Sequence, residues 1–216
     1  MDSLKIYDVL KDIPEAPRPE VSPIITINTG SGSTMIREYE ILDLLPENDK
    51  ILRTPAEPFD FKGFNRDQSF NSLLNPVYLG NSLFETMFLN KGLGLAAPQC
   101  GIPYAVFVMG ADPKNKQIMF NPVILQESAE KDSSIEGCLS YRNLFVKIPR
   151  AKAITVLWWT ADGKEHTGQF EGLTARVIQH EIDHLRGRVF WEGAGDTSLK
   201  MAQIKRTKLI KKRRRP

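Results

Sequence analysis

The sequence predicts an α+β fold, in which antiparallel β-sheets pack around one central helix in the C-terminal part of a single domain. Two observations predict it. Three short segments rich in β-branched and aromatic residues follow one another, at residues 104–109, 118–125 and 154–159, and a hairpin signal adds a fourth strand at 165–170. After them, residues 173–185 contain no glycine or proline and carry apolar residues at helical spacing. Helices before and after a run of strands indicate segregated elements rather than alternating βα units.

Proline and glycine residues predict where these helices and strands begin and end. Residues 82–90 also have helical spacing, and Pro76 lies upstream, so this helix should begin after Pro76 or kink there. Asp162 and Gly163 form a hairpin signal between the last two strands. Gly187 should end the late helix, as glycine commonly does.

Length and composition indicate a folded protein. The 216 residues are enough for one domain with a sizeable core, and 41% of them are hydrophobic and 25% charged. No run of about 18 apolar residues occurs, so we expect no membrane partner. The first twenty residues carry five acids and no continuous apolar block, which argues against a secretory or transit peptide. We therefore expect a cytoplasmic monomer.

The chain is predicted to have three parts. Residues 1–36 contain four prolines and end in a Gly-Ser run, which is typical of a flexible leader. Residues 37–199 form the domain. Residues 200–216 hold nine of the 29 basic residues and no acid, which leaves 20 basic against 26 acidic residues, a net charge of −6, in the rest. This tail is either a solvated segment or a helix over residues 201–212.

Residues 179–184 read QHEIDH and have the spacing of a metal site. On a helix His180 and His184 lie on one face and can share one ion, while Glu181 can reach a metal-bound water. A catalytic metal of this kind needs a third protein ligand. The motif alone does not supply it.

The third ligand has candidates on both sides of the motif. Downstream no His or Cys occurs, and Glu192 or Asp196 would complete a zinc peptidase. Upstream Cys138 offers a thiol in a turn-like setting, where Gly137 permits close backbone approach. Cys138 is alternatively a small buried residue, which is how we interpret Cys100.

Three segments resemble the signature motifs of the peptide deformylases, in that family's order. They are GLGLAAPQ at 92–99, EGCLS at 136–140 and QHEIDH at 179–184. The resemblance implies removal of the N-formyl group from the initiator methionine of nascent polypeptides, with one divalent metal ion. Its implied ligands are Cys138, His180 and His184. Fe²⁺ is the implied ion, and Zn²⁺, Ni²⁺ or Co²⁺ are alternatives for the same ligands.

The resemblance also implies roles for residues around the metal. Glu181 would take a proton from the attacking water and pass it to the departing amine. The side-chain amide of Gln99 and the backbone N–H of Leu139 would donate to the developing oxyanion. Gly94 would let an extended peptide pair with the backbone, as at a sheet edge.

An apolar slot for the methionine side chain is expected from Leu93, Leu173 and Val177. The latter two precede the first histidine of QHEIDH by seven and three residues, on the same side of the helix. Ordinary core packing is the alternative for each of the three. Arg150 and Asp183 carry opposite charges, and one hypothesis is that they pair and orient a ligand. A surface ion pair, or no contact at all, is the alternative.

The basic tail is similar in position and charge to the C-terminal extensions with which some bacterial deformylases contact the ribosome. Its run of bases would gain affinity for ribosomal RNA phosphates, through Lys211, Lys212, Arg213, Arg214 and Arg215. An RNA- or ribosome-binding protein with a structural metal is therefore an alternative from another class, beside the zinc peptidase.

Overall fold

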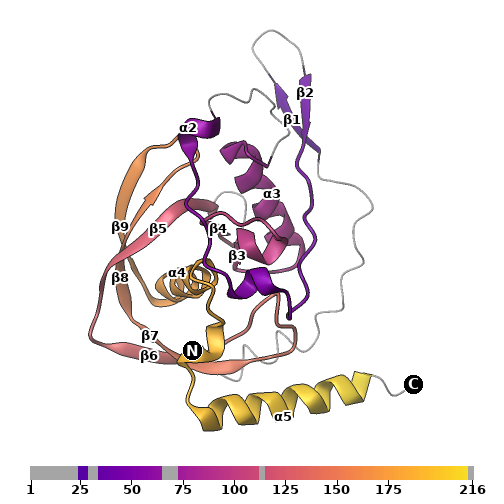
Figure 1. The fold of residues 1–216 in the computed structure, drawn as a ribbon, viewed down its shortest axis with the longest axis vertical. Coiled ribbons are helices and arrows are strands. Elements are labelled where there is room, and N and C mark those ends of the chain that lie inside the picture. Colours follow the sequence, from indigo (N-terminus) through magenta and orange to yellow (C-terminus); the bar gives the residue numbers. More distant parts are fainter. Residues whose placement is uncertain (1–23, 29–33, 65–72, 112–114, 214–216) are drawn as a thin grey trace.

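The structure is a computed structural model that describes residues 24–28, 34–64, 73–111 and 115–213 (Figure 1). The first 23 residues, the Gly-Ser run of the leader and residues 214–216 lie outside the described residues. Strands β1 (Ile24–Asn28) and β2 (Thr34–Glu38) pair antiparallel on either side of that run. The sequence does not predict this pair.

The architecture is a mixture of helices and antiparallel sheets, as predicted. The main sheet has the strand order β3-β4-β5-β8-β9. Its members are β3 (Gly94–Ala96), β4 (Val106–Met109), β5 (Gln117–Glu127), β8 (Ala153–Trp159) and β9 (Glu165–Glu171). The four predicted strands correspond to β4, β5, β8 and β9, each with its ends within two residues of the prediction. Gly163 lies in the β8–β9 turn with φ +74°, as a hairpin at this position requires.

A second antiparallel pair, β6 (Lys131–Glu136) and β7 (Val146–Ala151), was not predicted. Strand β6 reads KDSSIE and β7 contains Pro149, so neither has the apolar and aromatic composition by which strands are found. The pair matters because Glu136 ends one strand opposite Val146, and the loop between them carries EGCLS residues 137–140.

Helix α4 (Gly172–Leu185) lies between the main sheet and the β6–β7 pair, with contacts to β3, β4, β7, β8 and β9 (Figure 1). Its apolar face packs into a buried cluster with the sheet, formed by Ala175, Ile178, Ile182, Phe107 and Val156 among others. Beyond its end, Gly187 has φ +67°, and a Cβ there would lie 2.8 Å from the backbone of Thr54. Glycine is thus required at this stop by both conformation and space.

Helix α3 (Pro76–Leu89) packs on the face of β3 and β4 opposite to α4. Strand residues that contact α3, such as Val106 and Val108, alternate along the chain with those that face α4, such as Phe107. Pro76 is its first residue, at the position where a missing N–H costs nothing. The side chain of Asn75 accepts hydrogen bonds from the N–H groups of Val77 and Tyr78, at 2.9 and 3.1 Å. Short helices precede and follow α3, namely α2 (Phe61–Phe64), η1 (Lys50–Arg53) and η2 (Ala97–Cys100).

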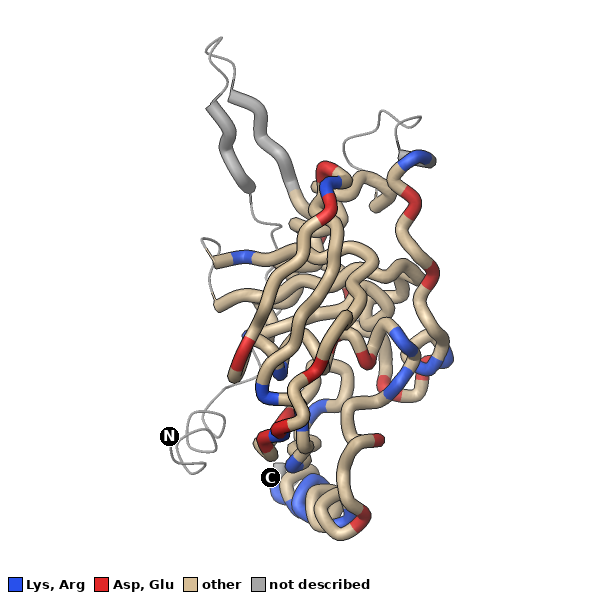
Figure 2. Tube along the Cα trace, turned by 90° about the vertical axis from the view of Figure 1, so that its left-hand side faces the viewer, with Lys and Arg blue, Asp and Glu red and all other residues tan. Residues whose placement is uncertain are grey.

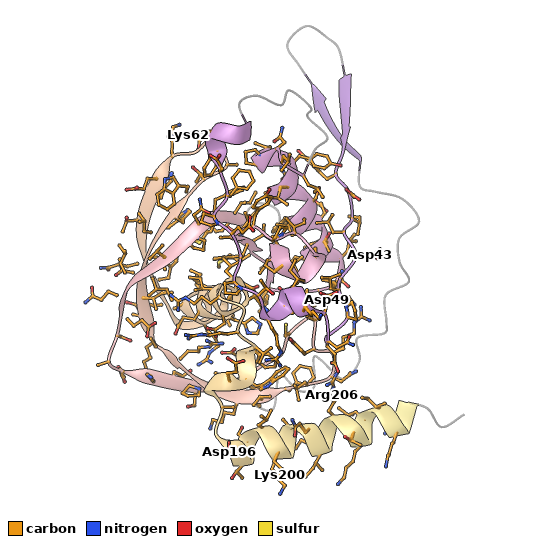
Figure 3. All side chains as sticks on the ribbon, in the orientation of Figure 1. Asp43, Asp49, Lys62, Asp196, Lys200 and Arg206 are labelled. Carbon is orange, nitrogen blue, oxygen red and sulfur yellow. The ribbon has the colours of Figure 1, made fainter. Side chains whose placement is uncertain are left out.

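The basic tail begins inside a helix. Helix α5 (Asp196–Arg213) follows η4 (Phe190–Gly193) and runs along the outside of β7. It buries Ala202 in a third cluster with Tyr141, Ile148 and Phe190. Arg206 points toward the domain, donating to the backbone oxygen of Arg142 at 3.0 Å and pairing with Glu47, whereas Lys200 points away (Figure 3).

Basic residues are concentrated along α5, whereas acidic and basic residues are mixed over the rest of the described chain (Figure 2). None of the helices in the described residues has the length and apolar character needed to span a bilayer.

Candidate metal centre and active site

Three side chains from two separate elements meet at one point. Cys138 lies two residues beyond β6, and His180 and His184 come from α4. Their ligand atoms all lie within 4.8 Å of one another, and Cys138 Sγ is 3.2 Å from His184 Nε2. Ligand atoms that each stand about 2.0–2.3 Å from one metal ion would have comparable separations. The described residues contain no other such group of three.

The downstream candidates for the third ligand lie elsewhere. Glu192 belongs to η4 and forms an ion pair with Arg53, with about half of its side chain exposed. Asp196 is the exposed first residue of α5. Of the ligands weighed from the sequence, the structure therefore brings only Cys138 to the two histidines.

The electrostatics of the two histidines fit a cation between them and the thiol. Burial lowers the pKa of His184 well below its ordinary value, so its ring is neutral, as a metal ligand must be. Burial also acts to lower the pKa of His180, yet contacts with Cys138 and Glu136 raise it to about 10. The surroundings of His180 therefore stabilise a positive charge at this position.

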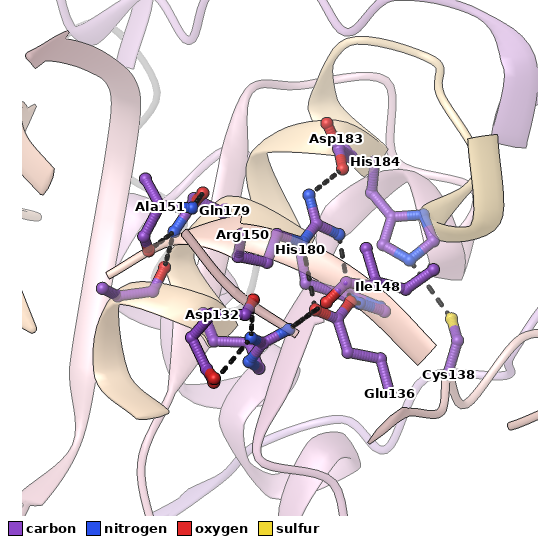
Figure 4. Close-up of polar contacts among 12 residues, drawn as sticks. Asp132, Glu136, Cys138, Ile148, Arg150, Ala151, Gln179, His180, Asp183 and His184 are labelled. Carbon is purple, nitrogen blue, oxygen red and sulfur yellow. Dashed lines mark hydrogen bonds and ion pairs between the residues drawn. The ribbon is translucent and has the colours of Figure 1, made fainter. Parts of the chain in front are cut away.

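A buried charge network lies behind His180 (Figure 4). The Nδ1 atom of His180 is 3.0 Å from Glu136, which also accepts hydrogen bonds from Arg150 at 3.0 Å and from Arg176 at 2.7 Å. Burial alone would raise the pKa of Glu136, but the hydrogen bonds and charges of His180 and Arg150 lower it to about 2. Arg150 pairs with Asp183 as well, so the expected Arg150–Asp183 contact is present, with Glu136 at its other end.

Arg176 joins α4 to both strands of the β6–β7 pair. Besides Glu136, its guanidinium donates to the backbone oxygens of Ile148 at 2.9 Å and Asp132 at 2.7 Å. The residue is buried, with 8% of its surface exposed. Arg176 thereby ties the strands that lead to Cys138 to the helix that carries the histidines. No local sequence pattern predicts a role for Arg176, whereas Glu136 stands two residues before Cys138, the spacing that repeats a face along an extended chain.

Glu181 is buried beside the three ligands. Burial raises the pKa of its carboxyl to about 7, and its Oε2 atom has no hydrogen-bond partner among the described residues. A buried carboxylate oxygen without a partner is costly unless it serves a ligand or a reaction. Its Oε1 atom lies against Gly94, where a Cβ would come within 2.3 Å. Only glycine fits at this position of β3 while Glu181 keeps its place.

Gln99 is also buried and lies at the end of the GLGLAAPQ segment, in η2. Its Oε1 accepts a hydrogen bond from Ala96 N at 2.8 Å. Its Nε2 donates to Ser140 Oγ at 3.0 Å and lies 3.4 Å from Cys138 Sγ. Leu139 lies between Cys138 and Ser140 in the sequence. Its side chain is partly buried against the apolar cluster that contains Leu83 and Met87 of α3. Ser140 is the last residue of the EGCLS segment, and its contact with Gln99 is not predicted from the sequence.

The residues expected to line the substrate slot differ in exposure. Leu93 is 50% and Leu173 63% exposed, whereas Val177 is partly buried and packs against the cluster beneath α4. Of the basic run, Lys211 and Lys212 are exposed on α5, and Arg213 is the last residue of that helix.

Comparisons with known protein sequences and structures all identify the same family. The sequence model of the polypeptide deformylase family matches residues 41–199. A peptide deformylase of Pseudothermotoga lettingae is 42% identical over 114 residues, which are 53% of this chain and 66% of that protein. A peptide deformylase of Brucella suis biovar 1 is 34% identical over 175 residues, 79% of this chain and 89% of that protein. The crystal structure of a peptide deformylase from Legionella pneumophila is similar with a TM-score of 0.66 and 31% identity, over 82% of this chain and 99% of that one.

Proposed function

The chain belongs to the polypeptide deformylase family, and on this premise we propose that Cys138, His180 and His184 hold the metal with which it works. The enzyme is a metal-dependent hydrolase that removes the formyl group from the formylmethionyl end of nascent polypeptides. The observation that carries the assignment of its site is the convergence of these three ligand atoms beside the buried carboxylate of Glu181.

The proposed ion is Fe²⁺, with Zn²⁺, Ni²⁺ and Co²⁺ as alternatives that one thiolate and two imidazoles also accept. A divalent ion held there would lower the pKa of water and polarise the formyl carbonyl. The tautomer of His180 supports its role as a ligand. Glu136, which lies beside its ring, is a carboxylate and can only accept a hydrogen bond. The Nδ1–H of His180 therefore donates to Glu136, and Nε2 is left as the ligand atom.

Glu181 is the proposed proton carrier. A pKa of about 7 lets its carboxyl accept a proton and release it again near neutral pH, which is the property that a general acid–base needs. Its Oε2 atom, which has no hydrogen-bond partner within the described part of the chain, is available for the attacking water and then for the departing amine.

Gln99 and Leu139 are the proposed hydrogen-bond donors to the oxygen that becomes negative during attack. The position of Gln99 Nε2, 3.4 Å from the sulfur of Cys138, supports this role, since the reacting carbonyl must come close to the ligands. Gly94, Leu93, Leu173 and Val177 are the proposed contacts of the peptide and its methionine side chain. The exposure of Leu93 and Leu173 leaves them free to be covered by substrate.

For the whole chain we propose a catalytic domain at residues 37–199, in agreement with the family match at 41–199, preceded by the leader and followed by the basic tail. The tail would contact ribosomal RNA through the five bases at 211–215. We further propose that the enzyme acts as a monomer in the cytoplasm, where nascent chains emerge.

A Cys138→Ser variant tests the proposed site. Purified without oxygen, it should lose metal and formate release from a formyl-Met peptide together, while its circular dichroism spectrum stays that of the parent. Undiminished metal content and turnover would refute the ligand set.

A further inference from the structure

The hydroxyl of Ser140 lies at the edge of the proposed active site and is not used by the reaction as described above. Its Oγ atom accepts a hydrogen bond from Gln99 Nε2 at 3.0 Å, and both residues are buried, with 7% and 2% exposed. We propose that Ser140 is a positioning residue, which fixes the amide of Gln99 in the orientation needed to stabilise the oxyanion. This inference rests on the role proposed for Gln99.

One end of the Gln99 amide faces the metal ligands, and the backbone of Ala96 decides which end this is. The backbone N–H of Ala96 can only donate, and it lies 2.8 Å from the Gln99 oxygen. Rotating the amide by 180° would place its NH₂ group against this N–H, donor against donor. Ala96 therefore directs Nε2 toward Ser140 and Cys138.

The amide plane can also rotate. The terminal torsion of a glutamine side chain is broad and soft, so a single hydrogen bond at Oε1 does not fix it. Nε2 carries two hydrogens in the amide plane. When one is donated to Ser140, the plane is set, and the remaining hydrogen can serve the side on which Cys138 Sγ lies, 3.4 Å from Nε2.

Burial makes this hydrogen bond hard to replace. A buried amide hydrogen without a partner costs free energy, so loss of the Ser140 hydroxyl leaves the Gln99 amide without the partner that its position requires. The chain position of Ser140 adds to the argument. Three consecutive residues would then supply a metal ligand from Cys138, an oxyanion donor from Leu139 and the anchor of the second donor from Ser140.

A purely structural role for Ser140 makes different predictions from a positioning role. A positioning residue acts through Gln99, so its removal should lower kcat, leave KM nearly unchanged and have no further effect once Gln99 is gone. A structural residue would lower thermal stability and add its own loss to that of Gln99.

The experiment is a double-mutant cycle on formate release from a short N-formylmethionyl peptide, at equal metal content. We expect Ser140→Ala to lower kcat about tenfold with KM within about twofold, the effect of one lost hydrogen bond in the transition state. Gln99→Ala should lower kcat about 10²–10³-fold, and the double variant should be no slower than Gln99→Ala alone. An additive loss in the double variant would overturn the inference.

Two further variants separate the explanations. Ser82→Ala removes another buried hydroxyl, one without a hydrogen-bond partner among the described residues, and should leave kcat unchanged. Ser140→Thr keeps an acceptor oxygen and should retain kcat within about threefold of the parent. A loss in Ser140→Thr equal to that in Ser140→Ala would count against the hydroxyl.

A readout without turnover uses the zinc-loaded protein labelled with ¹⁵N at glutamine. The Gln99 side-chain NH₂ signals, identified by their absence in Gln99→Ala, should exchange slowly with solvent in the parent and faster in Ser140→Ala. Equal exchange in both would contradict positioning.

The outcomes distinguish the inference from its premise. If the parent and Ser82→Ala released no formate, the proposed site as a whole would fail. If Gln99→Ala were slow and Ser140→Ala normal, only the role of Ser140 would fall.

Discussion

The Nδ1 atom of His180 lies 3.0 Å from a carboxylate oxygen of Glu136, and both side chains are buried. The contact orients the imidazole and sets its tautomer. Glu136 is itself held by two arginines, so the orientation of this ring depends on groups that never touch the metal position.

We predict that Glu136→Gln weakens metal binding by about 10–100-fold, the usual effect of removing the partner of a metal-ligating histidine. The amide keeps the shape but loses the charge that the His180 ring and both arginines face. Competition with a chelator measures the affinity. Glu130→Gln is the matched control, because Glu130 forms an exposed pair with Lys152. Equal affinities in both variants would contradict the prediction.

Arg176→Met should destabilise the fold by about 3–5 kcal/mol, since it leaves the buried Glu136 partly uncompensated and removes the side-chain hydrogen bonds to the backbone oxygens of Ile148 and Asp132. Unfolding in urea measures the change. Arg53→Met removes the partner of Glu192 at a site where both side chains are about half exposed, and should cost less than about 1 kcal/mol. The prediction fails if the two variants are equally stable.

Gly94→Ala should reduce kcat about 10²-fold while metal content is kept. The added Cβ would lie 2.3 Å from Glu181 Oε1, so the carboxylate must move, and small displacements of a catalytic group cost this much. Gly195→Ala adds the same methyl group where nothing lies within 4 Å and should be silent. Full activity of Gly94→Ala would show that Glu181 does not need its present position.

Burial, together with Asp43, raises the pKa of the Cys100 thiol from about 9 to about 12. Only the thiolate reacts with iodoacetamide, so at pH 8.5 Cys100 should be labelled slowly in the native protein and rapidly in urea, as followed by peptide mapping. The folded thiol stays protonated between these two pKa values while the unfolded thiol ionises. The free energy of unfolding should therefore fall as the pH rises from about 9 to 12, and Cys100→Ala should lack this component. Equal labelling rates in native and unfolded protein would refute the prediction.

Replacing the five bases at 211–215 by glutamine should weaken ribosome binding and flatten its dependence on salt, while turnover of a short peptide is unchanged. Sedimentation with ribosomes at several salt concentrations measures this. Deleting residues 200–216 is a less clean test, because it also removes Ala202 from a buried cluster and Arg206 from its contacts with the domain. Unchanged binding after the glutamine replacements would remove the tail from ribosome recognition.

The sequence motif and the helical periodicity are sufficient to predict α4 and its two histidines, because both signals lie within one short segment of the chain. Strands β6 and β7 could not be found in this way. Their polar residues are stabilised by partners such as Arg176, which lies 44 residues from Asp132, and no local pattern records a contact of that range.

Ser140 illustrates the same limit at the site. Its hydroxyl is meaningful only because Gln99, 41 residues away, reaches it in the folded chain. A role for Glu136 is easier to predict, because it lies two residues before Cys138 and therefore on the same face of an extended chain. The prolines and glycines of the leader predict a flexible segment, yet β1 reads IITIN, and its β-branched residues are the local signal by which a strand could be predicted there.

Cys138 and His184 are 46 residues apart, and the segments that carry them are joined by the buried contacts of Arg176 and Arg150. In an unfolded chain nothing holds Cys138 beside the two histidines, so the assembled ligand set exists in the native state alone. Metal capture and folding are therefore linked equilibria: each tenfold rise in free metal above the dissociation constant adds about 1.4 kcal/mol to the free energy of unfolding. The thermal midpoint of this enzyme should accordingly serve as a measure of how much metal is available to it.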